Sequence, residues 1–178
     1  TSKDGLYRYD GYSFTKYQLD PNDTNSVSQN FIYTIYEDKN GSIRLSTFEG
    51  LCRFDRSTDR FTRYKPLKTA KFSNPNITAI NEDADGMIWV GAASGGVCRF
   101  DSQKEKFVDE NYDFGNPQLP GGRPDGIICI SKDRSGTLWV GSRTGLHKIN
   151  LKRIPGQLSQ VSFDHYQHNP TNSNSISS

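Results

Sequence analysis

One sequence pattern occurs three times along the chain, and it constrains the fold more than any other feature. Each copy has an Ile-x-x-Ile run, an Asp-x-x-Gly turn signal and a short apolar run, and the copies begin at Ile32, Ile77 and Ile127. A second block of the type Gly-Leu-x-Arg-Phe-Asp follows each copy, and a further copy of this block occupies residues 5–10. The turn glycines of successive copies are 45 and 50 residues apart, which is the period of a four-stranded propeller blade.

Each copy divides into four short strands separated by turn signals. The first strand carries the Ile-x-x-Ile run, the second the apolar run after the turn, and the third the Gly-Leu-x-Arg-Phe-Asp block. The fourth is a Phe-x-x-Tyr run at residues 14–17, 61–64 and 163–166, whereas the second complete copy has Phe107 alone. We therefore expect an insertion at residues 109–123, where the other copies have a short polar linker.

The repeats predict an all-β chain in which residues 1–178 form a partial β-propeller of about 3.5 four-stranded blades. Residues 1–28 are expected to hold the third and fourth strands of a first blade and a linker. Blades are predicted at residues 29–75, 76–124 (with the inserted loop) and 125–173, and residues 174–178 begin the next blade. A closed ring needs about 4 to 8 blades. We therefore expect an open arc that packs against the remaining blades of the same protein or self-associates.

Charge and composition exclude several function classes. Lys and Arg total 22 against 20 Asp and Glu, without a basic block, whereas nucleic-acid-binding proteins concentrate positive charge on one face. No apolar run approaches the roughly 20 residues of a membrane helix. We therefore expect this segment to contact neither nucleic acid nor membrane. The three cysteines include no C-x-x-C pair, which predicts neither a disulfide framework nor a zinc site.

These repeats resemble the two-component regulator propeller repeats of hybrid two-component sensors from polysaccharide-degrading gut bacteria. The shared pattern is Asn-x-Ile-x-x-Ile-x-Glu-Asp-x-x-Gly-x-Ile-Trp-Val-Gly followed by Gly-Gly-Val-x-Arg-Phe-Asp, and residues 76–101 follow it nearly throughout. Residues 10–14, Asp-Gly-Tyr-Ser-Phe, look like the first blade of such sensors. The resemblance implies a periplasmic ectodomain of an inner-membrane protein. Two seven-bladed propellers and a further β-domain would signal to a histidine kinase and a DNA-binding regulator.

The first complete copy departs from this pattern. Arg44 and Ser46 stand where the other copies have tryptophan and glycine, and Lys132 replaces the glutamate in the third copy. We therefore expect the first complete blade to pack less regularly than the other two.

Residues with possible sugar or metal chemistry occur at repeated positions. Trp89 and Trp139 could stack on sugars, but their fixed place on the second strand favours packing between blades. Residues 81–86 resemble the start of a calcium-binding loop, but Ala92 stands where that loop needs a bidentate glutamate. We therefore expect no metal and no cofactor.

The histidines also favour a structural interpretation. His147 occupies the position of Cys52 and Cys98, which predicts blade packing, while His165 and His168 are three residues apart and point to opposite faces of a strand. No Ser-His-Asp set can be chosen and no nucleophile-elbow motif occurs, so we assign no catalytic residue. Cations recur on the third strand, where we expect them to bond a neighbouring strand or loop. They are Arg8, Arg53, Arg99 and Lys148.

Ligand contacts are expected in loops that break the repeat, because the recurring residues are committed to packing. The turns between second and third strands emerge at the same end of the blades as the linkers. Their mixed aromatic, polar and charged residues suit an oligosaccharide, especially an anionic one. The candidate ligand-binding residues are Phe48, Glu49, Ser94, Tyr112, Phe114, Arg123, Arg143 and Thr144.

The function expected from the repeats and the resemblance is a noncatalytic, extracytoplasmic sensor segment. It would recognise an oligosaccharide and signal to a histidine kinase that controls transcription of polysaccharide-utilisation genes. One alternative is a propeller enzyme of the streptogramin-lyase type, which would need a histidine and a carboxylate converging on the axial face. Another is a noncatalytic assembly scaffold without a small ligand.

Overall fold

The computed structural model describes residues 3–66, 75–112, 125–152, 154 and 157–176. These residues contain strands and turns but no helix, and therefore no helix that could cross a membrane. The strands are β1 (Leu6–Tyr9), β2 (Phe14–Tyr17), β3 (Ile32–Glu37), β4 (Ile43–Thr47), β5 (Gly50–Asp55), β6 (Arg60–Tyr64), β7 (Ile77–Glu82), β8 (Met87–Ala92), β9 (Val97–Asp101), β10 (Lys106–Tyr112), β11 (Ile127–Lys132), β12 (Leu138–Ser142), β13 (Leu146–Lys152) and β14 (Gln160–Tyr166).

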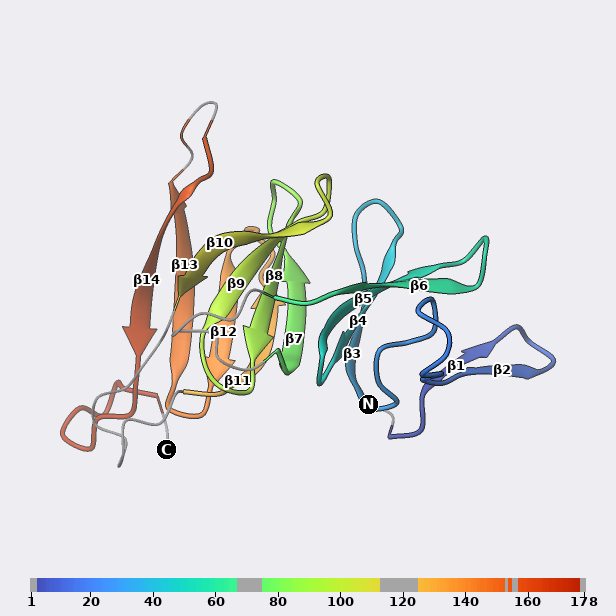
Figure 1. Ribbon diagram of the computed structural model, residues 1–178. Helices are drawn as coiled ribbons and strands as arrows, with labels where there is room; N and C mark the ends of the chain where they lie inside the picture. The colour runs from blue at the N-terminus through green and yellow to red at the C-terminus, as the bar shows by residue number, and fades with distance from the viewer. Residues whose placement is uncertain (1–2, 67–74, 113–124, 153, 155–156, 177–178) are drawn as a thin grey trace.

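Three successive groups of strands form four-stranded antiparallel sheets, each in sequence order, and β1 and β2 form a hairpin. We call the hairpin the half-blade, and the sheets β3–β6, β7–β10 and β11–β14 the first, second and third blades. The blades follow one another along an arc that does not close (Figure 1). The predicted all-β, open propeller arc is confirmed. The predicted blade boundaries remain predictions, because several border on residues outside the described chain.

An aspartate organises the turn between the first and second strands of each blade. In the second blade, Asp83 Oδ1 accepts hydrogen bonds from the backbone N–H groups of Asp85 and Met87, at 2.9 and 3.0 Å. Gly86 has a φ of 84°, which glycine adopts without a Cβ clash. Asp83 Oδ2 accepts the Trp89 Nε1–H at 2.9 Å. The aspartate therefore fixes both the turn and the tryptophan.

The prediction that the first blade packs less regularly than the other two was wrong. Arg44 is 2% exposed, and its Nε–H donates to Asp38 Oδ2 at 2.7 Å, which reproduces the tryptophan–aspartate bond of the other blades. The pairing of β3 with β4 also has the same register shift, between Ile32 and Thr34, as the equivalent pairs in the other two blades. One buried N–H donor has replaced another.

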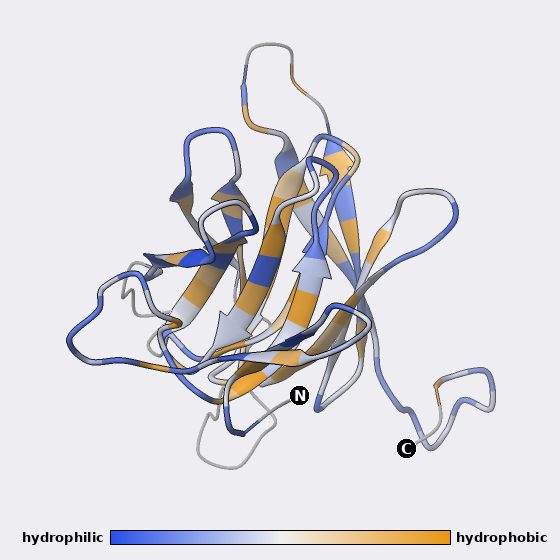
Figure 2. Ribbon diagram, turned by 90° about the vertical axis from the view of Figure 1, so that its right-hand side faces the viewer, coloured by the Kyte–Doolittle hydropathy of each residue, from blue (hydrophilic) through white to orange (hydrophobic). Residues whose placement is uncertain are grey.

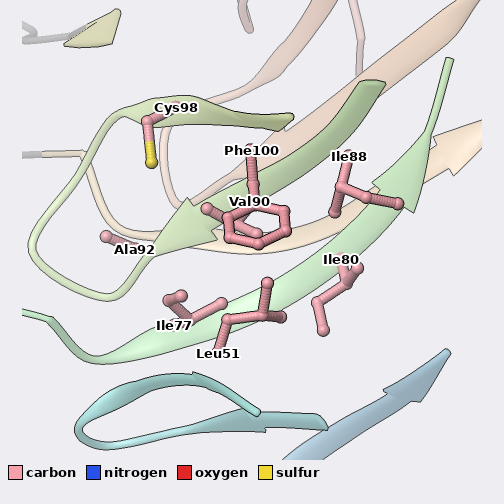
Figure 3. Close-up of a cluster of buried hydrophobic side chains, with 8 residues drawn as sticks. All are labelled: Leu51, Ile77, Ile80, Ile88, Val90, Ala92, Cys98 and Phe100. Atoms are coloured by element: carbon pink, nitrogen blue, oxygen red, sulfur yellow. The ribbon is translucent and has the colours of Figure 1, made fainter. Parts of the chain in front are cut away.

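Apolar and polar residues alternate along several strands (Figure 2), and the buried apolar residues form clusters between blades. Figure 3 shows Leu51 of the first blade lying beneath Ile77, Val90 and Phe100 of the second. A similar cluster joins the half-blade to the first blade, and another joins the second to the third. Each blade therefore buries its apolar faces only against its neighbours, as in other repeat proteins.

The two tryptophans differ in burial. Trp89 is 0% exposed in the cluster between the second and third blades, as the repeat predicted. Trp139 is only half-buried, because no blade within the described chain lies beyond the third. The prediction of a core position therefore holds for Trp89 and not for Trp139 in this chain.

The third-strand arginines join neighbouring blades, as predicted. Arg8 pairs with Asp59 at 2.5 Å and Arg53 with Glu105 at 3.2 Å. Arg99 donates from Nη1 to the carbonyl oxygen of Ser159 at 3.1 Å. Each acceptor is the residue immediately before the fourth strand of the following blade, so the three contacts repeat one arrangement. We call these contacts the blade clamps.

The first strands β3, β7 and β11 of consecutive blades lie side by side. The Thr34 hydroxyl donates to the carbonyl oxygen of Thr78 at 3.2 Å, and the Thr78 hydroxyl donates to that of Ile127 at 2.7 Å. The first strands of neighbouring blades are therefore joined directly by side chain-to-backbone hydrogen bonds.

The fourth strand of the second blade is longer than predicted. β10 pairs with β9 through Tyr112, with an irregularity between Phe107 and Asn111. The strand therefore runs into the region predicted as an insertion from residue 109.

Candidate functional site

The turns that follow Thr47, Ala92 and Ser142 lie at the ends of the second strands, beside the linkers. In the first blade the backbone N–H of Glu49 donates to Thr47 Oγ1 at 3.2 Å, and in the third the N–H of Thr144 donates to Ser142 Oγ at 3.3 Å. A hydroxyl on the last residue of the second strand thus fixes the same turn in both blades.

Three aromatic rings gather at the turn of the first blade. Phe31 and Tyr33 flank the start of β3, and Phe48 lies in the turn between β4 and β5. The ring centroids are 4.6, 5.1 and 5.3 Å apart, and Phe48 is 43% exposed. The Tyr33 hydroxyl accepts a hydrogen bond from Asn76 Nδ2 at 3.3 Å. The cluster therefore offers exposed aromatic surface beside polar groups.

Backbone contacts connect this cluster to the turns of the next two blades. The N–H of Ala93 donates to the carbonyl oxygen of Asn76 at 3.0 Å, and the N–H of Arg143 donates to that of Gly126 at 3.2 Å. A Cβ on Gly126 would lie 2.7 Å from the Ala93 carbonyl oxygen and 3.2 Å from Arg143 Nε. The turns therefore form a continuous strip across three blades. We call it the loop rim, and it comprises Phe31, Tyr33, Phe48, Asn76, Ser94 and Arg143.

The charges in and beside the loop rim differ in how they are paired within the described chain. Glu49 accepts hydrogen bonds from Lys65 Nζ and Gln29 Nε2, both at 3.1 Å, and these partners, Lys65 first, lower the pKa of its carboxyl group. Arg143 is exposed and forms no ion pair within the described chain. The rim thus offers one cation free to meet an anionic group.

A buried polar cluster lies beneath the Arg143–Thr144 turn. Asp125 is 0% exposed, and its Oδ2 accepts the hydroxyl protons of Ser142, at 2.5 Å, and of Thr144. Ser142 Oγ is 2.9 Å from His147 Nε2, and His147 Nδ1 is 2.7 Å from His165 Nδ1. Since the serine proton points to the carboxylate, His147 Nε2–H donates to Ser142 and His147 Nδ1 accepts from His165.

This cluster brings together a serine, a histidine and an aspartate, which the sequence did not indicate. In a hydrolytic triad the carboxylate binds the histidine nitrogen opposite the serine. Here Asp125 lies on the serine side, with its Oδ2 3.7 Å from His147 Nε2, and both side chains are at most 1% exposed. The cluster therefore holds the turn in place and has no arrangement for activating Ser142.

His147 is buried, as expected from its alignment with two cysteines. Burial is the main cause that lowers the pKa of the His147 imidazole, and the neighbouring His165 lowers it further against the opposing effect of Asp125. The ring is therefore held neutral by its surroundings.

The structure assembles most of the predicted ligand residues at one end of the blades. Phe48, Glu49, Ser94, Arg143 and Thr144 lie in the three turns, although Thr144 binds Asp125. Phe114 and Arg123 lie outside the described residues.

The predicted loop position of Tyr112 was wrong. Its ring stacks on Trp89 at 5.8 Å and contacts Phe163 edge-on at 5.4 Å, between the second and third blades.

The sequence analysis missed Phe31, Tyr33 and Asn76. The aromatic spacing Phe-x-Tyr at residues 31–33, which places both rings on one side of a strand, could have indicated the first two.

A separate pocket of about 330 Å³ lies near the Asp-x-x-Gly turns of the second and third blades. None of the predicted ligand residues lines it. Its walls include Asp85, Ser135, Lys148 and Asn150. Among the described residues, no group of three or more His, Cys, Asp or Glu side chains could hold a metal ion.

Comparison with protein families identifies two matching segments. Residues 71–94 and 121–144 match the family model of the two-component regulator propeller. No curated protein sequence matches the chain significantly.

Solved structures share the fold of this chain. The extracellular domain of the hybrid two-component system BT4673 from Bacteroides thetaiotaomicron has a TM-score of 0.74 and 21% identity, over 98% of this chain and 21% of that one. The extracellular domain of BT3049 from the same organism has a TM-score of 0.66 and 21% identity, over 99% of this chain and 27% of that one. An inactive virginiamycin B lyase from Staphylococcus aureus has a TM-score of 0.55 and 15% identity, over 85% of this chain and 44% of that one. The chain therefore spans about a fifth to a quarter of the two extracellular domains.

Proposed function

We propose that this chain, which carries two-component regulator propeller repeats, is a noncatalytic, ligand-sensing segment of a hybrid two-component sensor. The segment belongs to an extracytoplasmic part, in the periplasm, and signals to a histidine kinase that controls transcription of polysaccharide-utilisation genes. The family match and the shared fold with sensor extracellular domains support this role. The kinase and regulator lie in other parts of such a protein.

We further propose that the loop rim recognises an oligosaccharide. The observation that carries this proposal is the cluster of Phe31, Tyr33 and Phe48, which presents aromatic surface beside the Tyr33 hydroxyl and the Asn76 amide. Sugar rings have apolar C–H faces edged by hydroxyl groups, so they suit rings flanked by hydrogen-bonding partners. Arg143 adds a cation for a carboxylate or sulfate on the sugar.

The lyase alternative has one observation in its favour, the fold shared with virginiamycin B lyase. The structure also contains a histidine near a carboxylate, which that alternative requires. However, His147 and Asp125 are buried beneath a turn, and both are hydrogen-bonded to Ser142. A substrate could not reach them without displacing the Arg143–Thr144 turn, so the binding role is favoured.

Isothermal titration calorimetry with neutral, uronic and sulfated oligosaccharides tests the proposal. Phe48→Ala should weaken binding at least about tenfold, equivalent to about 1.4 kcal/mol. Arg143→Ala should weaken binding of anionic sugars selectively. Phe14→Ala is the matched aromatic control, because Phe14 is 70% exposed on the half-blade. Arg134→Ala, in the turn at the opposite end, is the matched cationic control. Equal effects of site and control variants would remove the loop rim as the ligand site.

A further inference from the structure

The pocket of about 330 Å³ near the Asp-x-x-Gly turns lies where the second and third blades meet. The turn of the second blade contributes Ala84 and Asp85 to its walls, and the turn of the third contributes residues 135–137. Leu138 of β12 and residues 148–151 of β13 complete the walls. Small-molecule sites in proteins have volumes of about 300–1,000 Å³. The pocket and the loop rim lie at opposite ends of the blades, because the turns before and after each second strand lie at its two ends.

Where the first and second blades meet, a lysine side chain occupies the equivalent space. Lys39 follows the turn aspartate of the first blade, and a Cβ on Gly86 of the second blade would overlap its Cε and Nζ atoms. The same Cβ would lie 3.3 Å from Glu82 Oε1, and Glu82 Oε2 accepts the backbone N–H of Lys39 at 2.8 Å. The lysine therefore lies across the turn glycine of the next blade, beside a buried carboxylate.

Two shorter side chains open this space between the second and third blades. Ala84 stands at the repeat position of Lys39, and Thr137 stands at that of Met87. The turn glycine of the third blade is Gly136, and a Cβ added to it would have no heavy atom of the described chain within 4 Å. The pocket therefore results from residues that distinguish this pair of blades from the preceding pair.

Two neutral polar side chains in the walls can bind a hydroxyl group. Ser135 Oγ donates to Asp133 Oδ1 at 2.6 Å, so the Thr137 hydroxyl donates to Ser135 Oγ, which is 2.9 Å away. The lone pairs of Thr137 Oγ1 can then accept a proton from a ligand. The Asn150 amide has no hydrogen-bond partner among the residues that the structure describes, and it provides both a donor and an acceptor.

The charges at the pocket favour a neutral ligand. Lys132 stands at the repeat position of Glu82, so the carboxylate that accompanies the Lys39 ammonium has no counterpart here. Asp85 and Lys148 line the pocket and carry opposite charges. Neither an ammonium nor a carboxylate group would therefore meet a net opposite charge.

We propose that this pocket binds a small neutral polyol of the size of one sugar ring. The hydroxyl groups of the polyol bond to Thr137 Oγ1 and the Asn150 amide, and its C–H groups contact the apolar side chains of Leu138, Ile149 and Leu151. A few polar groups that fix orientation within an apolar surface are typical of small-molecule sites. This second site does not depend on the function proposed for the loop rim.

Titration of the ¹⁵N-labelled chain with methyl β-glucopyranoside, followed by the backbone amide signals in NMR spectra, tests the proposal. The expected result is saturable, millimolar binding with the largest shift changes at residues 84–85 and 135–138. Ala84→Lys restores the side chain that fills the space between the first two blades, and it should weaken binding at least about tenfold. Asn40→Lys is the matched control, since it places a lysine in the equivalent turn of the first blade and should leave the affinity unchanged.

A second variant tests the hydrogen bond without filling the pocket. Thr137→Val keeps the shape of the side chain and removes its hydroxyl, so it should weaken binding several-fold while the amide signals far from the pocket stay unchanged. Full affinity in Ala84→Lys, or no saturable shift change in the unchanged chain, overturns the proposal. Shift changes confined to the loop rim also overturn it, and they leave the function proposed for the rim intact. Tighter binding of glucosamine or glucuronate than of the glucoside would refute a neutral ligand.

Discussion

Replacing each tryptophan with alanine should have unequal effects, because one ring is enclosed by two blades and the other by one. Trp89 is 0% exposed and donates to Asp83 Oδ2 at 2.9 Å. A buried tryptophan removes about 150–250 Å² from water, worth roughly 4–6 kcal/mol at about 25 cal/mol per Å². Alanine retains part of this contact, so Trp89→Ala should cost about 3–5 kcal/mol. Trp139 keeps the equivalent bond to Asp133 but is half-buried, so Trp139→Ala should cost about half as much.

Urea unfolding followed by far-ultraviolet circular dichroism measures both losses, with the free energies taken from midpoint shifts at constant slope. Phenylalanine at each position is the control, since it keeps an aromatic ring but removes the N–H donor and part of the ring surface. Equal losses for the two alanine variants, or a larger loss for Trp139→Ala, would refute the argument that the following blade determines the burial of this position.

Three further predictions follow from the described contacts. Arg44→Met should lower the melting temperature strongly, because it leaves the buried Asp38 carboxylate without its cation. Arg44→Trp should keep the melting temperature close to that of the unchanged protein, because the indole supplies an N–H donor. Equal melting temperatures for the two variants would contradict this. The lowered pKa of His147 means that the unfolded state binds its proton more readily. Its contribution to stability is therefore complete above the ordinary value near 6.5 and is lost as the pH falls below it. His147→Cys should flatten the fall in urea midpoint between pH 7.5 and 5.5, and an unchanged fall would exclude His147 as its source. In the folded protein only Cys129 should react rapidly with a thiol reagent, since Cys52 and Cys98 are buried and burial raises the pKa of both thiols; denatured, unreduced protein should titrate three thiols, and fewer would reveal a disulfide.

The repeat made most of the fold predictable. Three copies in register fix where each strand begins, and the Asp-x-x-Gly signal fixes the turn between the first two. The fourth strand of the second blade escaped prediction because its Phe107 and Tyr112 are five residues apart instead of three. The irregular pairing of β10 absorbs the two additional residues. Tyr112 consequently belongs to the packing between blades.

The candidate site was less predictable, because it depends on contacts between residues far apart in the sequence. The turns themselves could be located from the broken repeat. The pairing of Tyr33 with Asn76 is a contact between two blades, and no local pattern encodes it. The bond from Ser142 to Asp125 likewise depends on how a linker meets the end of a second strand. From the sequence alone, arginine at position 44 in place of the repeat's tryptophan predicted disruption. Only the three-dimensional structure shows that arginine and tryptophan donate an equivalent N–H to the turn aspartate.

The blade clamps have a mechanical consequence. The side chains of the two charged clamps are 32–45% exposed, and exposed ion pairs of this kind contribute about 0–1 kcal/mol each and weaken in salt. The first strands are instead held by hydrogen bonds from Thr34 and Thr78 to neighbouring backbone. We therefore expect the arc to be stiffer along the edge formed by the first strands than along the edge formed by the blade clamps. A small change in the angle between blades should cost the least free energy when the blades rotate about the first strands. Such a rotation would change the spacing of the turns that carry Phe48, Ser94 and Arg143.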